Sequence, residues 1–292
     1  MTPSQANDFA IYTTGLTKSF GSHNAVDSID LRVPKGSIFG FLGPNGSGKT
    51  TTIRMLMALA KVSAGEIQIL GLAIPRDAGK ALPKVGALVE GPAFYPYLSG
   101  RDNLIRFDAA DRYADPATRK DRVNAALTRV GLMQAADKKV HAYSLGMKQR
   151  LGIANALLQP RELLVLDEPT NGLDPQGTRE VRNLIRSLAL EGITIFISSH
   201  LLVEIEQICT HLAVMSQGKI VAQGSVEELS ASHTLNLKLA TIDSERALEG
   251  LESVGIKAHV DGEVVTAFVP VGQIEPERIV QVLVELGVRV KS

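Results

Sequence analysis

A glycine-rich stretch at residues 43–50 has the residue types and spacing needed to bind a polyphosphate. It follows the pattern G-x-x-x-x-G-K-[ST], in which glycines let backbone N–H groups approach the phosphates. The lysine can reach the β- and γ-phosphates, and the threonine hydroxyl can bind Mg²⁺. The alternative is a glycine-rich turn beside a surface lysine. The residues predicted to bind the nucleotide are Gly43, Pro44, Asn45, Gly46, Ser47, Gly48, Lys49, Thr50 and Thr51.

The elements on either side of this loop favour the phosphate site over the turn. Residues 37–42 form a short apolar run that is typical of a buried strand, and residues 51–56 have a helical pattern. A helix that starts at the loop adds unpaired N–H donors and the positive end of its dipole. The order strand, glycine loop, helix is the context that this motif requires.

Two adjacent acids, Asp167 and Glu168, follow a second buried strand at residues 162–167. Downstream of a phosphate loop, the first acid can hold the water shell of Mg²⁺, and the second can act as general base for the water that attacks the γ-phosphate. The alternative is a pair of acids that ends a strand at a turn.

The pattern of apolar residues predicts an α/β core with a helical insertion. Strands are expected early in the chain and again at 192–198, and a helix at 176–190 links two of them as in a parallel sheet. Between about 91 and 155 the pattern becomes helical, with helices expected at 101–113 and 116–130. The expected early strands are 11–14, 25–33, 37–42, 66–71 and 85–89.

Beyond Gly224 the composition changes to that of a small separate unit, residues 225–292. The expected order is strand, helix, two strands, helix and strand, which is that of a ferredoxin-like α+β unit. We interpret this unit as a packing or docking module because it contains no catalytic cluster. The expected elements are 234–239, 244–253, 256–260, 264–269, 275–286 and 288–290.

Composition excludes several classes of protein. Lys+Arg and Asp+Glu both number 31, and this balance argues against a nucleic-acid partner. Cys209 is the single cysteine, so an intramolecular disulfide is excluded, and we expect it to fill space in the core. The polar N-terminus does not resemble a signal peptide, and no apolar run approaches about 20 residues. We therefore expect a soluble, cytoplasmic protein.

These motifs together resemble those of the ATPase subunit of ATP-binding cassette (ABC) transporters, over about residues 10–224. Residues 43–50 match the Walker A loop, 163–168 the Walker B strand, 171–174 the D-loop and 143–150 the family signature. His200 matches the switch histidine, and Phe20 stands where the family has an aromatic that stacks on adenine. The resemblance implies a P-loop NTPase cassette with a parallel core sheet, an N-terminal antiparallel β-subdomain and a helical subdomain.

The resemblance also implies roles for particular residues. Catalysis is assigned to Glu168, His200 and Lys49, with ATP and Mg²⁺ as cofactors. Ser144 and Gly146 of the signature are implied to complete the nucleotide site of a second subunit, and Asp174 of the D-loop is implied to bind the nucleotide. Each has an ordinary alternative: His200 as a helix cap or surface residue, Asp174 as a helix N-cap, and Phe20 as part of the core.

Two departures from the family pattern affect these roles. Met147 stands in place of the last residue of the usual Leu-Ser-Gly-Gly-Gln signature, so the contact made by that glutamine is lost. Glu90 aligns with the glutamine that bridges Mg²⁺ and the membrane partner, and a carboxylate is also a ligand for Mg²⁺. The predicted metal ligands are Thr50, Glu90 and Asp167. These variants are similar to the ABC-2 type branch, which includes bacitracin, lantibiotic and multidrug exporters.

The function implied by the resemblance is ATP hydrolysis that drives export through a separate membrane permease. One Walker A loop and one signature per chain imply a homodimer around two ATP molecules, held at the inner face of the membrane through an ABC-2 type permease. The aromatic stretch at residues 94–97 is a candidate docking surface for that permease. The alternatives are a soluble cassette ATPase acting on ribosomes or nucleic acid, and a regulatory module without turnover.

Overall fold

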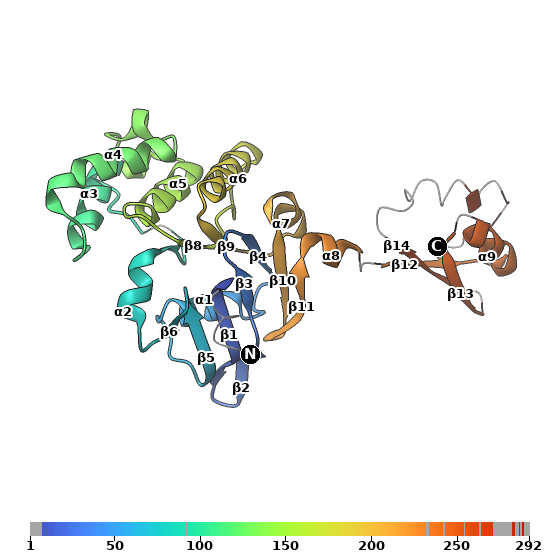
Figure 1. Cartoon of the computed structure of the whole chain (residues 1–292). Coiled ribbons are helices and arrows are strands. Elements are labelled where there is room, and N and C mark those ends of the chain that lie inside the picture. The colour runs from blue at the N-terminus through green and yellow to red at the C-terminus, as the bar shows by residue number, and fades with distance from the viewer. Residues whose placement is uncertain are drawn as a thin grey trace. The chain divides into compact units, whose positions relative to one another are not determined.

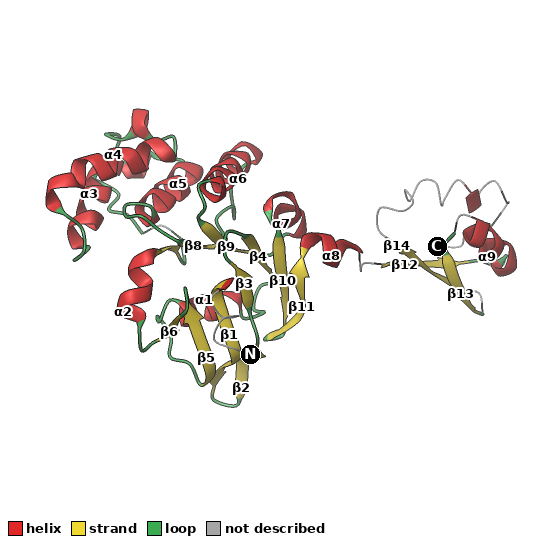
Figure 2. Cartoon of the chain, in the orientation of Figure 1, coloured by secondary structure: helices red, strands yellow, loops and turns green. Residues whose placement is uncertain are grey.

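The computed structural model divides the chain into two compact units, Met1–Gly224 and Ser225–Ser292. Figures 1 and 2 show the elements of each unit, coloured along the chain and by secondary structure. The structure describes residues 8–91, 93–231, 234–241, 243–253, 255–262, 264–270, 282–283, 286 and 288.

The first unit begins with an antiparallel sheet of order β2-β1-β5-β6, with β3 also paired to β1. The first strand is much longer than the predicted 11–14, because irregularities in its pairing on both sides break the alternation that marks a strand in sequence. Gly15, with a φ of +55°, lies at one of these irregularities. The strands are β1 (Phe9–Phe20), β2 (His23–Ile29), β3 (Arg32–Pro34), β5 (Ala64–Ile69) and β6 (Leu72–Ile74).

The second sheet has the order β11-β10-β4-β9-β8-β7, and its strands from β10 to β7 are parallel. Every residue of β4, β8 and β9 is buried, which explains the apolar runs at 38–42, 163–166 and 195–197 in the sequence. The rings of Phe39 and Phe41 of β4 pack against the ring of Phe196 of β9. The strands are β4 (Ile38–Leu42), β7 (Val85–Leu88), β8 (Leu163–Asp167), β9 (Thr194–Ser199), β10 (His211–Ser216) and β11 (Lys219–Ser225).

Three central strands, β4, β9 and β8, lie side by side, and the predicted site residues follow them at one edge of the sheet. Because they are parallel, the loops that follow them all lie at their carboxyl ends. Helices α1 (Lys49–Leu56), α6 (Pro175–Leu190) and α7 (Leu202–Ile208) come after these loops. A short helix, α2 (Ala78–Ala81), lies between β6 and β7.

Helix α7 packs so closely on β4 that a Cβ atom at Gly40 would collide with Ile205. Cys209 lies at the same contact, and its burial raises the pKa of the thiol to about 12. The expected role of Cys209 as a core residue is confirmed, since its side chain is 8% exposed.

A group of helices, α3 (Gly100–Ala110), α4 (Arg119–Arg129) and α5 (Leu145–Ala156), forms the inserted subdomain on one side of this unit (Figure 1). Ser99 caps α3 by accepting a hydrogen bond from the backbone N–H of Asp102. The predicted helix at 116–130 begins as a 3₁₀ turn, Pro116–Thr118, and becomes α-helical only at Arg119. Proline starts that turn because it has no N–H to lose there.

Asp108 of α3 is a buried carboxylate that holds the helical subdomain together. Its side chain is 0% exposed and pairs with Arg119 at 2.9 Å and with Arg122 at 2.8 Å. Burial alone would raise the pKa of Asp108, but hydrogen bonds from Arg122 and Arg119 outweigh it and lower that pKa below 3.8. The ionised carboxylate therefore fastens α3 to the start of α4.

Replacing Asp108 with alanine should lower the free energy of unfolding at pH 7 by about 3 kcal/mol, because two arginines lose their buried partner. Since the folded-state pKa is depressed, this stabilisation is complete above pH 3.8 and is lost as the pH falls through the lower folded-state pKa. Urea unfolding at several pH values measures both effects. Asp121→Ala, an exposed acid on α4, is the matched control. Equal stability of the two variants at pH 7 would refute the role of Asp108.

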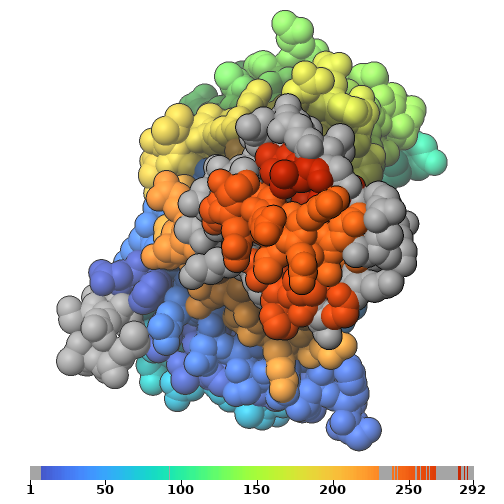
Figure 3. Space-filling model, turned by 90° about the vertical axis from the view of Figure 1, so that its right-hand side faces the viewer, coloured from blue at the N-terminus to red at the C-terminus, as the bar shows by residue number. Residues whose placement is uncertain are grey.

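The second unit contains β12 (Thr234–Ala240), α9 (Ser244–Ser253), β13 (Lys257–Asp261) and β14 (Val264–Pro270), after α8 (Val226–Ala231). Its sheet order is β12-β14-β13, with β14 antiparallel to both neighbours. This places the third strand between the first two, as in a split βαβ unit. The predicted helix 275–286 and strand 288–290 lie largely outside the described residues. Figure 3 shows the surface of this unit in orange and red.

Candidate active site

The glycine loop at residues 43–50 joins β4 to α1, as the sequence predicts. A Cβ atom at Gly43 would collide with the Met215 carbonyl, and one at Gly48 with the Ala25 carbonyl, so neighbouring strands leave no space for side chains there. Gly48 also has a φ of +107°, which favours glycine. The Ser47 Oγ is buried without a hydrogen-bond partner in the described structure. A buried hydroxyl without a partner in a glycine-rich loop fits a phosphate ligand.

Lys49 is buried at the base of the loop. Its Nζ donates hydrogen bonds to the carbonyls of Gly43 at 2.6 Å and Pro44 at 3.2 Å, and lies 3.4 Å from Glu168 Oε1. The sequence predicts both Lys49 and Glu168 as site residues but does not predict that they form a pair. Their contact joins the Walker A loop to the end of the Walker B strand.

Thr50 and Asp167 form a pair of hard oxygen ligands. Thr50 Oγ1 donates to Asp167 Oδ2 at 3.1 Å, although the residues are 117 positions apart. Within the described residues no cluster of three or more His, Cys, Asp or Glu side chains could hold a metal by itself. A threonine hydroxyl and one carboxylate are sufficient for Mg²⁺, which usually keeps several waters and shares the phosphates of a substrate. The residues present therefore fit a nucleotide-bound Mg²⁺.

Glu168 lies at the point where the loops after β8 and β9 meet. Its Oε2 is 2.9 Å from His200 Nδ1, so the predicted base and the predicted switch histidine are in contact. Glu168 has a φ of +49°, which is uncommon for a residue other than glycine. This backbone turn directs the carboxylate toward both Lys49 and His200.

Glu90 is placed differently from the other predicted metal ligands. In the described part of the chain its polar contact is an ion pair with Arg54 of α1, and its side chain is about half exposed. The structure thus brings Thr50 and Asp167 together but gives Glu90 a cationic partner instead. The role of Glu90 as a metal ligand stays a prediction.

Phe20 ends β1 with its ring 57% exposed, so the alternative that it belongs to the core is wrong. Lys18 Nζ lies 4.8 Å from the centre of the ring. An exposed aromatic face beside a cation can accept a planar base.

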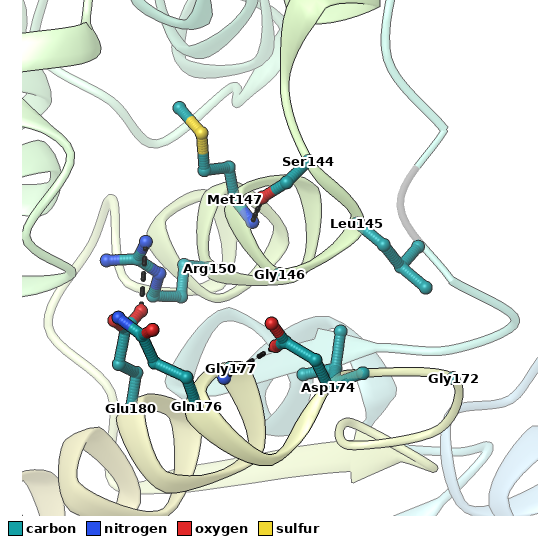
Figure 4. A pocket seen from close by; sticks show the side chains of 11 residues that line it. Ser144, Leu145, Gly146, Met147, Arg150, Gly172, Asp174, Gln176, Gly177 and Glu180 are labelled. Carbon is teal, nitrogen blue, oxygen red and sulfur yellow. Dashed lines mark hydrogen bonds and ion pairs between the residues drawn. The ribbon is translucent and has the colours of Figure 1, made fainter.

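Ser144 and Asp174 cap two helices that face each other across a pocket of about 490 Å³ (Figure 4). Ser144 Oγ accepts a hydrogen bond from the Met147 N–H, and Asp174 Oδ1 accepts one from the Gly177 N–H. An ion pair between Arg150 and Glu180, at 3.2 Å, joins α5 to α6 along this pocket. Asp174 is an N-cap, as the ordinary alternative states, and its D-loop role stays a prediction.

The signature and the glycine loop do not line a common pocket among the pockets found in the described residues. The residues that line the pocket beside the signature include none from the loop at 43–51. Leu145 of the signature is 48% exposed, and a Cβ atom at Gly146 would make only ordinary contacts, with Gly177 at 3.8 Å and Leu173 at 3.9 Å.

The family profile for ABC transporters matches residues 26–171, which include the glycine loop, the signature and both acids. The chain belongs to the ABC transporter family. It is 45% identical to the bacitracin transport ATP-binding protein BcrA of Bacillus licheniformis over 83% of this chain and 78% of that protein. It is 38% identical to the daunorubicin resistance ATP-binding protein DrrA3 of Streptomyces coeruleorubidus, over 77% and 71% of the two chains.

The fold is also similar to that of a solved ABC transporter component. CbiO1 of Clostridium perfringens, part of the ABC transporter complex cbiONQ, superimposes with a TM-score of 0.70 and 29% identity, over 77% of this chain and 92% of that one. The predicted P-loop ABC cassette is therefore confirmed. This ABC protein is an ATP-binding subunit and an ATPase. Within the described residues, none of its helices has the length and apolar character needed to cross a bilayer.

Sequence reasoning missed the residues of this ABC cassette that link the loops of Glu168 and His200. Ser198 Oγ donates to Asp167 Oδ1 at 2.5 Å and accepts from the Glu168 N–H at 2.9 Å. Glu204 of α7 receives hydrogen bonds from Thr170 and Ser199. Serine, threonine and glutamate near a strand end are too common to indicate such links. The only sequence signal was their position beside His200 and Glu168.

Proposed function

We propose that this ABC ATPase is the motor subunit of an exporter and works as a homodimer around two Mg²⁺–ATP, bound peripherally to the cytoplasmic face of the membrane through an ABC-2 type permease. The observation that carries this proposal is that the pocket beside the signature has no lining residue from the glycine loop. A second copy supplies the missing half of each site, and a twofold axis makes the two sites equivalent.

In the proposed reaction, Lys49 and the loop N–H groups hold the β- and γ-phosphates, and Phe20 stacks on the base. Thr50 and Asp167 hold Mg²⁺, which neutralises charge on the phosphates. Glu168 accepts the proton of the attacking water, and His200 keeps that carboxylate in place from 2.9 Å. Ser144 and Gly146 of the second copy approach the γ-phosphate from the opposite side.

The aromatic stretch at residues 94–97 supports permease docking at the helical subdomain. Tyr95 and Tyr97 are 52% and 77% exposed. The neighbouring Phe94 packs against Phe107 of α3 and so ties the loop to the helical subdomain. Exposed tyrosines on an anchored loop are typical of protein interfaces. The names of the relatives, which concern bacitracin and daunorubicin, support antibiotic-like compounds as the exported class.

Co-purification with a candidate ABC-2 type permease tests the proposal. We expect a stable complex in detergent, with ATPase activity that responds to candidate peptides and antibiotics. Tyr97→Ala should weaken this complex, whereas Tyr113→Ala, which changes another exposed tyrosine of the helical subdomain, should not. Sedimentation with ribosomes, without any membrane partner, would support the soluble cassette alternative instead.

A further inference from the structure

Glu204 joins the two loops that carry the catalytic groups. Its Oε2 accepts a hydrogen bond from Thr170 Oγ1 at 2.6 Å and another from Ser199 Oγ at 3.3 Å. Thr170 lies two residues after Glu168, and Ser199 lies directly before His200. A single carboxylate oxygen on α7 thus accepts hydrogen bonds from the loop that carries Glu168 and from the residue before His200.

The Glu168 backbone needs such support. With a φ of +49° it occupies a sparsely populated conformation, which persists only where the surroundings hold it. On one side, the Glu168 N–H donates to Ser198 Oγ; on the other, the Asn171 N–H donates to the Glu168 carbonyl at 3.1 Å. Thr170 lies within this second turn, so its bond to Glu204 fixes the turn from outside.

Helix α7 gives Glu204 a rigid base. Ile205, the next residue, is 1% exposed and packs on Gly40 of the central strand β4. Ser199 Oγ also accepts a hydrogen bond from the Leu201 N–H at 3.0 Å, which shapes the entry to this helix. The position of Glu204 is therefore set by the sheet itself rather than by either loop.

We propose that Glu204 is a positioning residue for ATP hydrolysis. Its carboxylate fixes the position of the loop of Glu168 relative to the loop of His200. It acts through Thr170 and Ser199 and touches neither the nucleotide nor the attacking water. The inference rests on the proposed roles of Glu168 and His200. Hydrogen bonds to a charged group are among the stronger ones in proteins, so their loss should be visible in turnover.

The test compares four variants of the full chain in steady-state ATP hydrolysis. Glu204→Ala should lower kcat about tenfold and leave the KM for ATP within about twofold, because the base is displaced while the phosphate loop is intact. Glu204→Gln, whose amide oxygen can still accept both hydroxyls, should stay within about threefold of wild type. Thr170→Val, which removes one donor at constant size, should reproduce part of the loss. Glu206→Ala changes an exposed glutamate on the same helix and is the control.

A double-mutant comparison separates positioning from general destabilisation. Glu204→Ala and Thr170→Val together should cost less than the product of the single effects, since both remove the same hydrogen bond. Wild-type kcat in Glu204→Ala, or a Glu204→Gln variant as slow as Glu204→Ala, overturns the proposal. Inactivity of the wild-type chain would instead contradict the proposed function, so the two failures are distinguishable.

Discussion

Glu168→Gln should bind ATP but hydrolyse it about 10²–10⁴-fold more slowly, which is the range attributed to a positioned general base. Glutamine keeps the shape of the side chain but cannot accept the proton of the attacking water. It also removes the negative charge that lies 3.4 Å from Lys49 Nζ, so the lysine stays available for the phosphates. Phosphate release and equilibrium binding of labelled ATP measure the two quantities separately.

Glu162→Gln is the matched control for this prediction. Glu162 directly precedes β8, whereas Glu168 directly follows it, and its side chain pairs with Lys84 at the surface. We expect its turnover within about twofold of wild type, since exposed ion pairs contribute little. Hydrolysis by Glu168→Gln within about threefold of wild type would remove Glu168 from the role of base.

The second large effect concerns the division of the site between two copies. Lys49→Ala and Ser144→Arg should each abolish hydrolysis when expressed alone, because one removes the phosphate ligand and the other blocks the signature. Mixing the two variants should restore activity, because a heterodimer unites the intact Lys49 of one copy with the intact Ser144 of the other. With free exchange of subunits in an equal mixture, half of the dimers would be heterodimers, each with one of its two sites intact. The expected hydrolysis is therefore about a quarter of wild-type activity.

This mixing experiment distinguishes a shared site from a site within one chain. If each chain contained a complete site, every copy in the mixture would carry a damaged one, and no activity would return. The control mixes Lys49→Ala with Glu168→Gln, two changes on the Walker side of the site. Every heterodimer then has both sites damaged, so activity should stay absent. Recovery in this control would contradict the placement of Lys49 and Glu168 on the same side of the site.

The local patterns that position the nucleotide could be read from the sequence. Glycines at 43, 46 and 48, the lysine and the threonine occupy one continuous turn, and the strand before it is a continuous apolar run because both faces of the sheet are covered. The two acids at the end of β8 likewise come after a buried apolar run. These features depend on neighbours along the chain, so a sequence pattern is sufficient to find them.

Elements with irregular geometry were less predictable. The strand expected at 11–14 extends from Phe9 to Phe20, since it changes partners at breaks in pairing that interrupt the period-two pattern. The exposure of Phe20, which excludes it from the core, depends on where that extension ends.

The sequence by itself determined the family of this protein and predicted its phosphate loop and catalytic acid, because each is encoded in a short run of residues. Only the tertiary structure decided which side chains hold the phosphate loop and this acid in place. Lys49 meets Glu168, Ser198 meets Asp167, and Glu204 meets Thr170 because the sheet places β4, β9 and β8 side by side. The order of strands in a sheet is a long-range property. It brings together hydroxyls and carboxylates that carry no distinguishing mark in the sequence.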